Sequence, residues 1–278
     1  MASELAGWLA LREASDEAAR SEGVTSAVIT ALPAARPLTI VDLGAGTGSN
    51  IRYLSKRLAG AQRWTAVDRD DDLMTGVPDG VATRRAELGS IDGSLLAGAH
   101  LVTASALLDL VSTEWLERLA AACRESGAAV LFALTYDGRS ACTPPDPDDD
   151  LILELFNMHQ RRNDKGFGRA AGPDAVGHAY QAFAKHGYEL VQEASDWSLP
   201  ASMQALQTEL MTGWAQAATE IVPEFAGRID AWLRRRLDHL RQGRSTIRVG
   251  HQDIGGWLPG PRHILREGGV GNDAAASR

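Results

Sequence analysis

The sequence predicts an α/β fold, in which helices cover both faces of a doubly wound, mostly parallel sheet. Three observations favour it. Short apolar, β-branched runs alternate with amphipathic segments between residues 38 and 136, glycines follow directly after the first run, and an aspartate follows the second. Strands that alternate with helices form right-handed βαβ units, and such units build a parallel sheet.

The elements of the first half follow in order from these patterns. Residues 3–20 and 24–32 predict two helices, which we assign to an N-terminal helical cap over 1–37. The run 38–43 predicts a strand that is buried on both faces. The patterns beyond it predict helices at 50–58, 70–75 and 113–125, and strands at 63–67, 81–85, 100–104 and 128–135.

The second half is richer in predicted helix. An acidic, proline-rich turn at 144–150 precedes an apolar helix at 151–161, since carboxylates are favourable at a helix N-terminus. Further helices are expected at 173–186, 200–220 and 224–241, and strands at 188–193 and 246–252. We therefore expect one domain over 38–258 with helical insertions at 146–172 and 198–243, followed by a tail over 259–278.

Composition excludes several classes of function. Acidic residues outnumber basic ones by 36 to 28, which gives a formal charge of -8 and disfavours nucleic acid as a partner. No run approaches the length of a membrane span, and early charges at the N-terminus argue against a signal peptide. We predict no metal site, because metal-ligand spacing is absent from Cys123 and Cys142 and from His239, His251 and His263. We also predict that the protein is cytoplasmic.

The most informative segment joins a glycine turn to an acid. Residues 41–50 read VDLGAGTGSN, and Asp68 ends the next predicted strand, twenty residues past Gly48. Glycines after a strand let the backbone approach a ligand, and a carboxylate at the second strand accepts hydrogen bonds from a ribose diol. The pair predicts a site for an adenosine-containing ligand.

Two details favour an amino-acid-bearing nucleoside over a dinucleotide. The third glycine of the dinucleotide motif GxGxxG is replaced by Ser49. Asp42 precedes the turn, where a carboxylate suits an ammonium group better than a pyrophosphate. An NAD(P)-dependent oxidoreductase stays the alternative from the same geometry, and a non-catalytic nucleoside-binding module is a third possibility.

These residues resemble the first two cofactor motifs of the class I S-adenosylmethionine-dependent methyltransferases. Ala86-Glu87-Leu88 resembles the family's adenine-contacting pair, and residues 101–111 resemble its fourth-strand segment, which includes Ser105. The resemblance implies a Rossmann-like, seven-stranded sheet completed by a reversed hairpin. The cofactor-binding residues that it implies are Asp42, Gly44, Ala45, Gly46, Thr47, Asn50, Asp68, Arg69, Glu87, Leu88 and Ser105.

The chain departs from the family at two places that bear on the acceptor. It lacks the Asn/Asp-Pro-Pro-Tyr/Phe run after the fourth strand, which is typical of members that methylate exocyclic amines of bases or glutamine. A largely helical segment replaces the usual turn between the last two strands. The resemblance therefore implies methyl transfer to an O, N or C nucleophile of a small molecule.

Candidate catalytic residues are Tyr136, Asp137 and His159. The first two follow the fifth strand, where ligands bind in such folds, although an ordinary turn explains them equally well. His159 is a candidate base or an ordinary surface histidine.

Candidate acceptor-binding residues are Arg12 and Arg20 on the N-terminal helix, and Arg162 and Phe167 in the segment 148–172. This segment would either close over the site as a lid or pack as part of the core. The stripe Met203, Leu206, Leu210, Trp214 and Ala217 is expected to be core or a homodimer contact, and Arg234 to Arg236 a solvated helix face.

Overall fold

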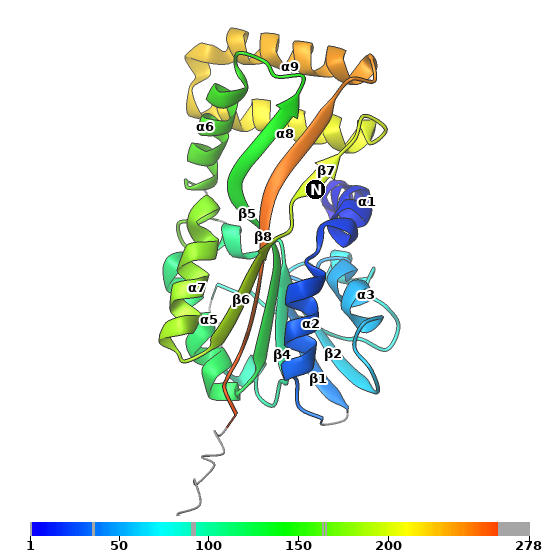
Figure 1. The fold of residues 1–278 in the computed structure, drawn as a ribbon, viewed down its shortest axis with the longest axis vertical. Coiled ribbons are helices and arrows are strands. Elements are labelled where there is room, and N and C mark those ends of the chain that lie inside the picture. Colours follow the sequence, from blue (N-terminus) through cyan, green and yellow to red (C-terminus); the bar gives the residue numbers. More distant parts are fainter. Residues whose placement is uncertain (1, 35–36, 90–92, 163, 165, 261–278) are drawn as a thin grey trace, which may run out of the picture.

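A computed structural model describes residues 2–34, 37–89, 93–162, 164 and 166–260 of the chain. Its centre is an eight-stranded sheet with the strand order β3-β2-β1-β4-β5-β8-β6, and β7 pairs with β8 away from this path (Figure 1). The bounds of the strands are β1 (Leu38–Leu43), β2 (Gln62–Asp68), β3 (Ala82–Arg85), β4 (Leu101–Ser105), β5 (Ala129–Thr143), β6 (Glu189–Ala194), β7 (Trp197–Leu199) and β8 (Thr246–Trp257). Strands β1 to β5 pair in parallel, and β8 is antiparallel to its three neighbours.

The helices cover both faces of this sheet, as a doubly wound fold requires (Figure 1). Their bounds are α1 (Ala2–Ala19), α2 (Glu22–Ala31), α3 (Ser49–Ser55), α4 (Asp71–Met74), α5 (Thr113–Ser126), α6 (Asp149–Gln160), α7 (Ala175–Lys185), α8 (Gln204–Ile221) and α9 (Ala226–Arg241), with 3-10 turns at Gly93–Leu95, Leu108–Leu110, Gly172–Asp174 and Pro223–Phe225. Along β1, Val41 and Leu43 face the core beneath α5 and α7, whereas Leu38 and Ile40 face the core beneath α2 and α3. The strand is therefore buried on both faces, as its apolar run predicts.

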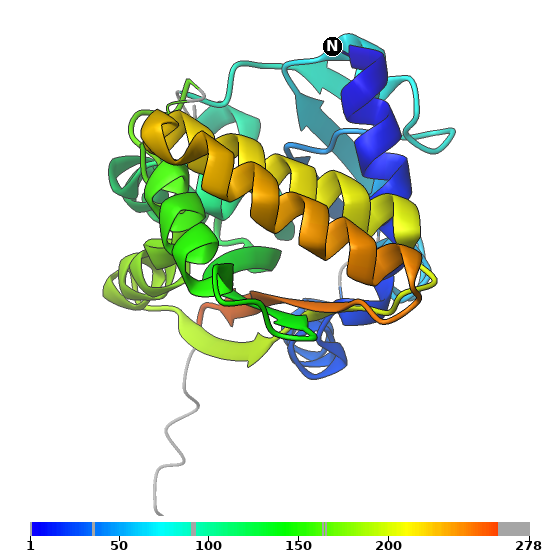
Figure 2. The same cartoon turned by 90° about the horizontal axis from the view of Figure 1, so that it is seen from above.

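A third hydrophobic core lies above the sheet, where β5 and β8 continue as a ribbon (Figure 1). Helices α8 and α9 run side by side across this ribbon, and α6 flanks it (Figure 2). The stripe that we expected to be core or a dimer contact contributes to this core within the chain: Leu206 and Trp214 are buried, and Met203 and Leu210 pack against it.

The ribbon corrects three expectations. β5 was predicted to end at residue 135 but continues to Thr143, β8 continues to Trp257, and the short β7 was not predicted, so the sheet has eight strands instead of seven. Strand β5 remains paired because two irregularities, between Phe132 and Thr135 and between Tyr136 and Ser140, absorb its extra residues. Isolated apolar patterns do not reveal such a continuation, because its upper half reads as a turn.

Two of the three arginines of α9 differ from the expected solvated face, whereas Arg234 is exposed as expected. Arg235 donates from Nε to Asp146 Oδ2 at 2.6 Å and from Nη2 to Asp148 Oδ2 at 2.7 Å. Arg236 is fully buried and donates to the carbonyl oxygen of Pro144 at 2.5 Å. The acidic turn and α9 therefore neutralise each other, and the ion pairs attach the second helical insertion to the start of α6.

His251 is buried inside the upper ribbon, 6% exposed, on β8. Its ring lies 5.0 Å from that of Trp197 and 6.2 Å from that of Tyr136, measured between centroids. Burial lowers the pKa of His251 to about 3, and the nearby Arg12 guanidinium acts in the same direction. The imidazole is therefore neutral in the folded protein at pH values at which the unfolded chain already protonates it.

This difference predicts an acid-sensitive fold. Below its unfolded pKa near 6.5, the histidine binds a proton in the unfolded chain only, so stability falls as the pH drops toward 3. On going from pH 7 to pH 5, the wild type should lose about 2 kcal/mol more unfolding free energy than His251→Phe loses. Urea unfolding at both pH values measures it. An equal loss of unfolding free energy between the two pH values in the wild type and in His251→Phe would contradict the assignment.

Candidate functional site

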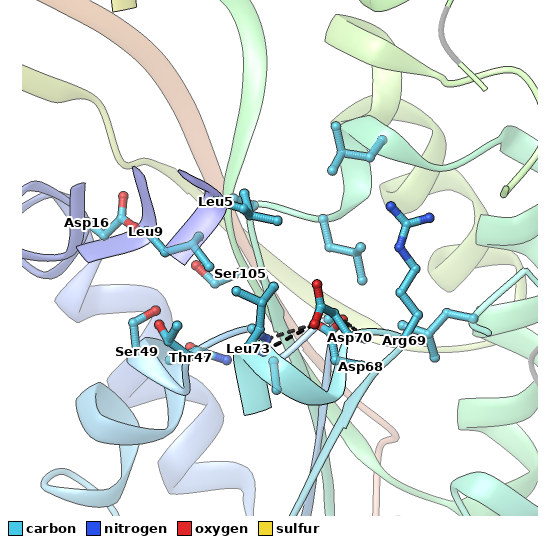
Figure 3. A pocket seen from close by; sticks show the side chains of 18 of the residues that line it. Leu5, Leu9, Asp16, Thr47, Ser49, Asp68, Arg69, Asp70, Leu73 and Ser105 are labelled. Atoms are coloured by element: carbon cyan, nitrogen blue, oxygen red, sulfur yellow. Dashed lines mark hydrogen bonds between the residues drawn. The ribbon is translucent and has the colours of Figure 1, made fainter. Parts of the chain in front are cut away.

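A cavity of about 230 Å³ opens at the carboxyl ends of β1, β2 and β4 (Figure 3). The glycine turn after β1, the start of α4, the segment after β4 and α1 surround it. Its lining residues are Leu5, Leu9, Arg12, Asp16, Gly44, Ala45, Gly46, Thr47, Ser49, Asn50, Asp68, Arg69, Asp70, Leu73, Ala86, Leu88, Ser105, Ala106, Leu107, Leu110 and Phe167. This is the edge of the sheet at which open α/β folds bind ligands.

The glycine turn is built by backbone conformations that other residues adopt with strain. Gly44, Gly46 and Gly48 have φ values of +64°, +51° and +81°. The turn closes by a hydrogen bond from Gly48 N–H to the Ala45 carbonyl at 2.8 Å, and α3 begins at the next residue. The N-terminus of α3 therefore lies at the cavity, where Ser49 and Asn50 are among the lining residues.

Asp68 ends β2 and is oriented by this turn. Its Oδ2 accepts the backbone N–H of Gly46 at 2.9 Å, and its Oδ1 accepts that of Asp70 at 3.1 Å. A carboxylate oxygen accepts more than one hydrogen bond, so both oxygens keep the capacity to accept ribose hydroxyls. Asp70 in turn caps α4 by accepting the N–H groups of Asp72 and Leu73.

Beneath the turn lies a buried polar network. Asn50 Nδ2 donates to Asp42 Oδ1 at 2.6 Å, and Asn50 Oδ1 accepts from Arg20 Nη1 at 2.8 Å. Burial raises the pKa of Asp42 to about 7, although the bond from Asn50 and the charge of Arg20 act against this. Asp42 thus fixes the amide of Asn50, which itself reaches the cavity.

Helix α1 forms one wall and is tied to the turn by Arg52. Arg52 donates to both carboxylate oxygens of Glu13 at 2.7 Å and to the carbonyl oxygen of Thr47 at 2.7 Å. Leu9 Cδ1 lies only 3.1 Å from the position that a Cβ on Gly46 would occupy. The N-terminal helix is therefore packed directly over the glycine turn.

Most of the predicted cofactor residues line this cavity. They are Gly44, Ala45, Gly46, Thr47, Asn50, Asp68, Arg69, Leu88 and Ser105. Two do not: Asp42 is fully buried behind Asn50, and Glu87 is exposed while its neighbours Ala86 and Leu88 face inward. The expected direct contact of Asp42 with an ammonium group is corrected to support of Asn50.

The acceptor candidates separate into two groups. Arg12 and Phe167 line the cavity. Arg20 does not line the cavity, because its side chain is 2% exposed and forms a buried ion pair with Asp253 at 3.6 Å. Arg162 is exposed outside the cavity lining. Residues 163 and 165 of the expected lid segment lie outside the described residues, as do 261–278 of the expected tail and His263.

None of the three candidate catalytic side chains is part of the cavity lining. Tyr136 donates its hydroxyl to Asn157 Oδ1 at 2.9 Å, and burial raises its pKa. Asp137 accepts Arg139 Nε at 2.8 Å, and His159 Nε2 lies 3.0 Å from Glu220 Oε2. The expectation placed Tyr136 and Asp137 at the end of β5, but the strand continues past them, so they lie in the ribbon.

Sequence reasoning missed several lining residues. Asp16 lies on the N-terminal helix that was expected to close the acceptor pocket, and Leu107 and Leu110 lie in the segment 101–111 that resembles the family's fourth-strand segment, but none of the three was named as a site residue. A charged residue four positions after Arg12 was the available signal for Asp16, because such residues share one helix face. Asp70 was detectable as a helix cap, since it is the first residue of the helix predicted at 70–75.

Comparisons with known proteins bear on the fold. No family model and no curated protein matches this sequence. A putative type II methyltransferase from Anaeromyxobacter dehalogenans has a similar structure, with a TM-score of 0.53 at 16% identity over 87% of this chain and 98% of its own. The YcgJ protein from Bacillus subtilis gives 0.48 at 12% over 86% and 100%, and an S-adenosylmethionine dependent methyltransferase from Mesorhizobium loti gives 0.41 at 18% over 81% and 96%.

The first of these similarities confirms the predicted fold class. The chain has a Rossmann-like α/β fold similar to that of this solved structure, with β8 as the reversed strand between β5 and β6. Within the described ranges, no three or more His, Cys, Asp or Glu side chains are grouped as a metal site would require. None of the helices in the same ranges has the length and hydrophobicity needed to cross a membrane.

The glycine turn yields a test with a matched control. Gly48 and Gly187 have nearly equal φ values of +81° and +82°, but a Cβ on Gly48 would lie 3.0 Å from Val77 Cα and Pro78 Cδ, whereas one on Gly187 would meet no atom within 4 Å. Gly187→Ala should cost about 1–2 kcal/mol for the left-handed backbone alone. Gly48→Ala should cost about 1–3 kcal/mol more because of overpacking. Equal losses in urea unfolding would show that the turn tolerates a side chain at Gly48.

Proposed function

We propose that this protein is an S-adenosylmethionine-dependent methyltransferase, which transfers a methyl group to an O, N or C nucleophile of a small molecule. The observation that carries the proposal is Asp68, which the Gly46 N–H orients at the end of β2 beside the glycine turn. A ribose diol matches this carboxylate, and Ala86 and Leu88 offer apolar surface for an adenine.

The cavity also suits the chemistry of methyl transfer. When bound, the cofactor would supply a methyl group on a sulfonium sulfur, and an acceptor attacking the methyl carbon in line would displace the thioether, whose sulfur keeps the electron pair of the broken carbon–sulfur bond. The protein has to align the two reactants and exclude water, for which Leu5, Leu107, Leu110 and Phe167 provide an apolar wall. A general base is required only for an acceptor that loses its proton early, so the absence of a histidine from the cavity lining is compatible with this reaction.

Two alternatives share part of this geometry. An NAD(P)-dependent oxidoreductase is disfavoured because Ser49 stands where the dinucleotide motif has glycine or alanine. A non-catalytic nucleoside-binding module would need only the cofactor half of the cavity. Incubation with methyl-labelled cofactor and a metabolite extract distinguishes this module from an enzyme, because only an enzyme labels a product.

A small-molecule acceptor is supported by charge. The formal charge is -8, and in the basic run of α9 Arg235 and Arg236 are engaged with Asp146 and Asp149. A nucleic-acid acceptor would require several free cations on one face, because phosphate contacts dominate such binding. The walls of the cavity are predominantly apolar, so we expect an acceptor with substantial apolar surface.

Ligand selectivity tests the proposed cofactor. The protein should bind S-adenosylhomocysteine in calorimetry and show no measurable binding of NADH at the same concentrations, since the turn lacks the third glycine of a dinucleotide site. Preferential binding of NADH would overturn the proposal in favour of an oxidoreductase.

Asp68 gives the corresponding mutational test. Asp68→Asn keeps the size of the side chain but loses its charge, so S-adenosylhomocysteine affinity should fall by about 1.5–3 kcal/mol, the worth of hydrogen bonds to a charged group. Asp71→Asn removes an exposed acid three residues away and should bind as the wild type does. A folded Asp68→Asn protein with unchanged affinity would refute the placement of the ribose.

A further inference from the structure

The cavity has two chemically different ends. At one end lie Asp68, Arg69 and Asp70, and at the other lie Asp16, Ser49 and Ser105 (Figure 3). If the nucleoside occupies the Asp68 end, the remainder of the cofactor extends toward the end formed by Asp16. Of the three residues at this second end, only Ser105 is among the cofactor-binding residues that the motifs of the sequence imply.

The second end contains an oriented ion pair from α1. Arg12 Nε donates to Asp16 Oδ2 at 2.9 Å, and Arg12 Nη2 donates to Asp16 Oδ1 at 3.2 Å. The two side chains are only 13% and 14% exposed, and both line the cavity. Trp197 holds the pair in place: its Nε1 donates to Asp16 Oδ1 at 3.0 Å, and the Arg12 guanidinium lies 5.0 Å from its ring centroid.

We infer that Arg12 and Asp16 recognise the amino-acid end of S-adenosylmethionine, with the guanidinium on its carboxylate and the Asp16 carboxylate on its ammonium group. This inference rests on the proposed function. It moves Arg12 from the acceptor to the cofactor and makes α1 a part of the cofactor site.

Charge and hydrogen-bonding capacity support this assignment. Burial raises the pKa of Asp16 even though Arg12 and Trp197 act against it, so one guanidinium does not fully compensate the buried carboxylate. A ligand ammonium would supply the missing positive charge. The guanidinium carries more N–H donors than its two bonds to Asp16 use, so donors remain for a ligand carboxylate.

The arrangement also fits a zwitterion better than a single charge. A ligand with both signs replaces the mutual attraction of Arg12 and Asp16 by two new ion pairs, and leaves neither side chain buried without a partner. A ligand with only one charge would leave one of them uncompensated, which is costly at this degree of burial. The pair therefore discriminates against nucleosides that lack the amino acid.

Two ligands separate this role from a purely structural one. S-adenosylhomocysteine and 5′-methylthioadenosine share the nucleoside and the thioether, but only the first carries the amino acid. Calorimetry with both ligands should show tighter binding of S-adenosylhomocysteine by the wild type. Arg12→Met and Asp16→Asn should each weaken S-adenosylhomocysteine about tenfold to hundredfold, the effect of one charged hydrogen-bond partner, while 5′-methylthioadenosine affinity stays within about twofold.

The controls keep the test decisive. Glu17→Gln neutralises the exposed neighbour of Asp16 on the same helix and should leave both affinities unchanged. Arg12→Lys keeps the charge without the two-point geometry and should fall between Arg12→Met and the wild type, and thermal unfolding establishes that each variant is folded. Parallel loss of both ligands, or no loss of either, would overturn the inference alone. Wild-type protein that binds neither ligand would overturn the proposed function and the inference with it.

Discussion

The buried guanidinium of Arg20 is the interaction on which the arrangement of the site depends. It donates to Asn50 Oδ1 and lies 3.6 Å from Asp253, and burial lowers its pKa although the charges of Asp253, Asp42 and Asp16 act against this. Asp253 also accepts the N–H of Ser21, at the start of α2, and that of Leu134, in β5. One cation therefore fixes the junction of α1 and α2, the floor of the cavity and the point at which β5 becomes irregular. Removal of either Arg20 or Asp253 would leave the other charge buried without its ion-pair partner.

This network joins the cofactor half of the molecule to its N-terminal helix. Arg20 follows the end of α1, while Arg52 holds the middle of that helix to the glycine turn through Glu13 and the Thr47 carbonyl. The apolar residues of helix α1 are not concentrated on one face. The position of the helix therefore depends on these charged contacts and on Trp8, which packs near Trp197. The wall of the cavity is thus set by contacts between side chains far apart in sequence.

The sequence allowed the cofactor half to be predicted, because its signals are local. Glycines with positive φ, an aspartate at a strand end and buried apolar runs each occupy a few consecutive residues. Long-range pairs left no such signal: the ion pairs of Arg235 and Arg236 with the acidic turn span almost ninety residues, and a run of three arginines reads as an exposed face. Tyr136 was misplaced for the same reason, since the continuation of β5 depends on pairing with β8.

The irregularities in β5 divide one continuous strand into two independent halves. Each extra residue opposite β8 exchanges the faces to which the following side chains point, so the alternation below Phe132 does not dictate that above Thr135. The lower half belongs to the two cores of the sheet, and the upper half, with Tyr136, belongs to the core of the helical layer. The helical layer can therefore diverge in sequence pattern, length and shape while the register beneath the glycine turn stays constant. A strand of this kind allows the same cofactor-binding sheet to be combined with different helical layers.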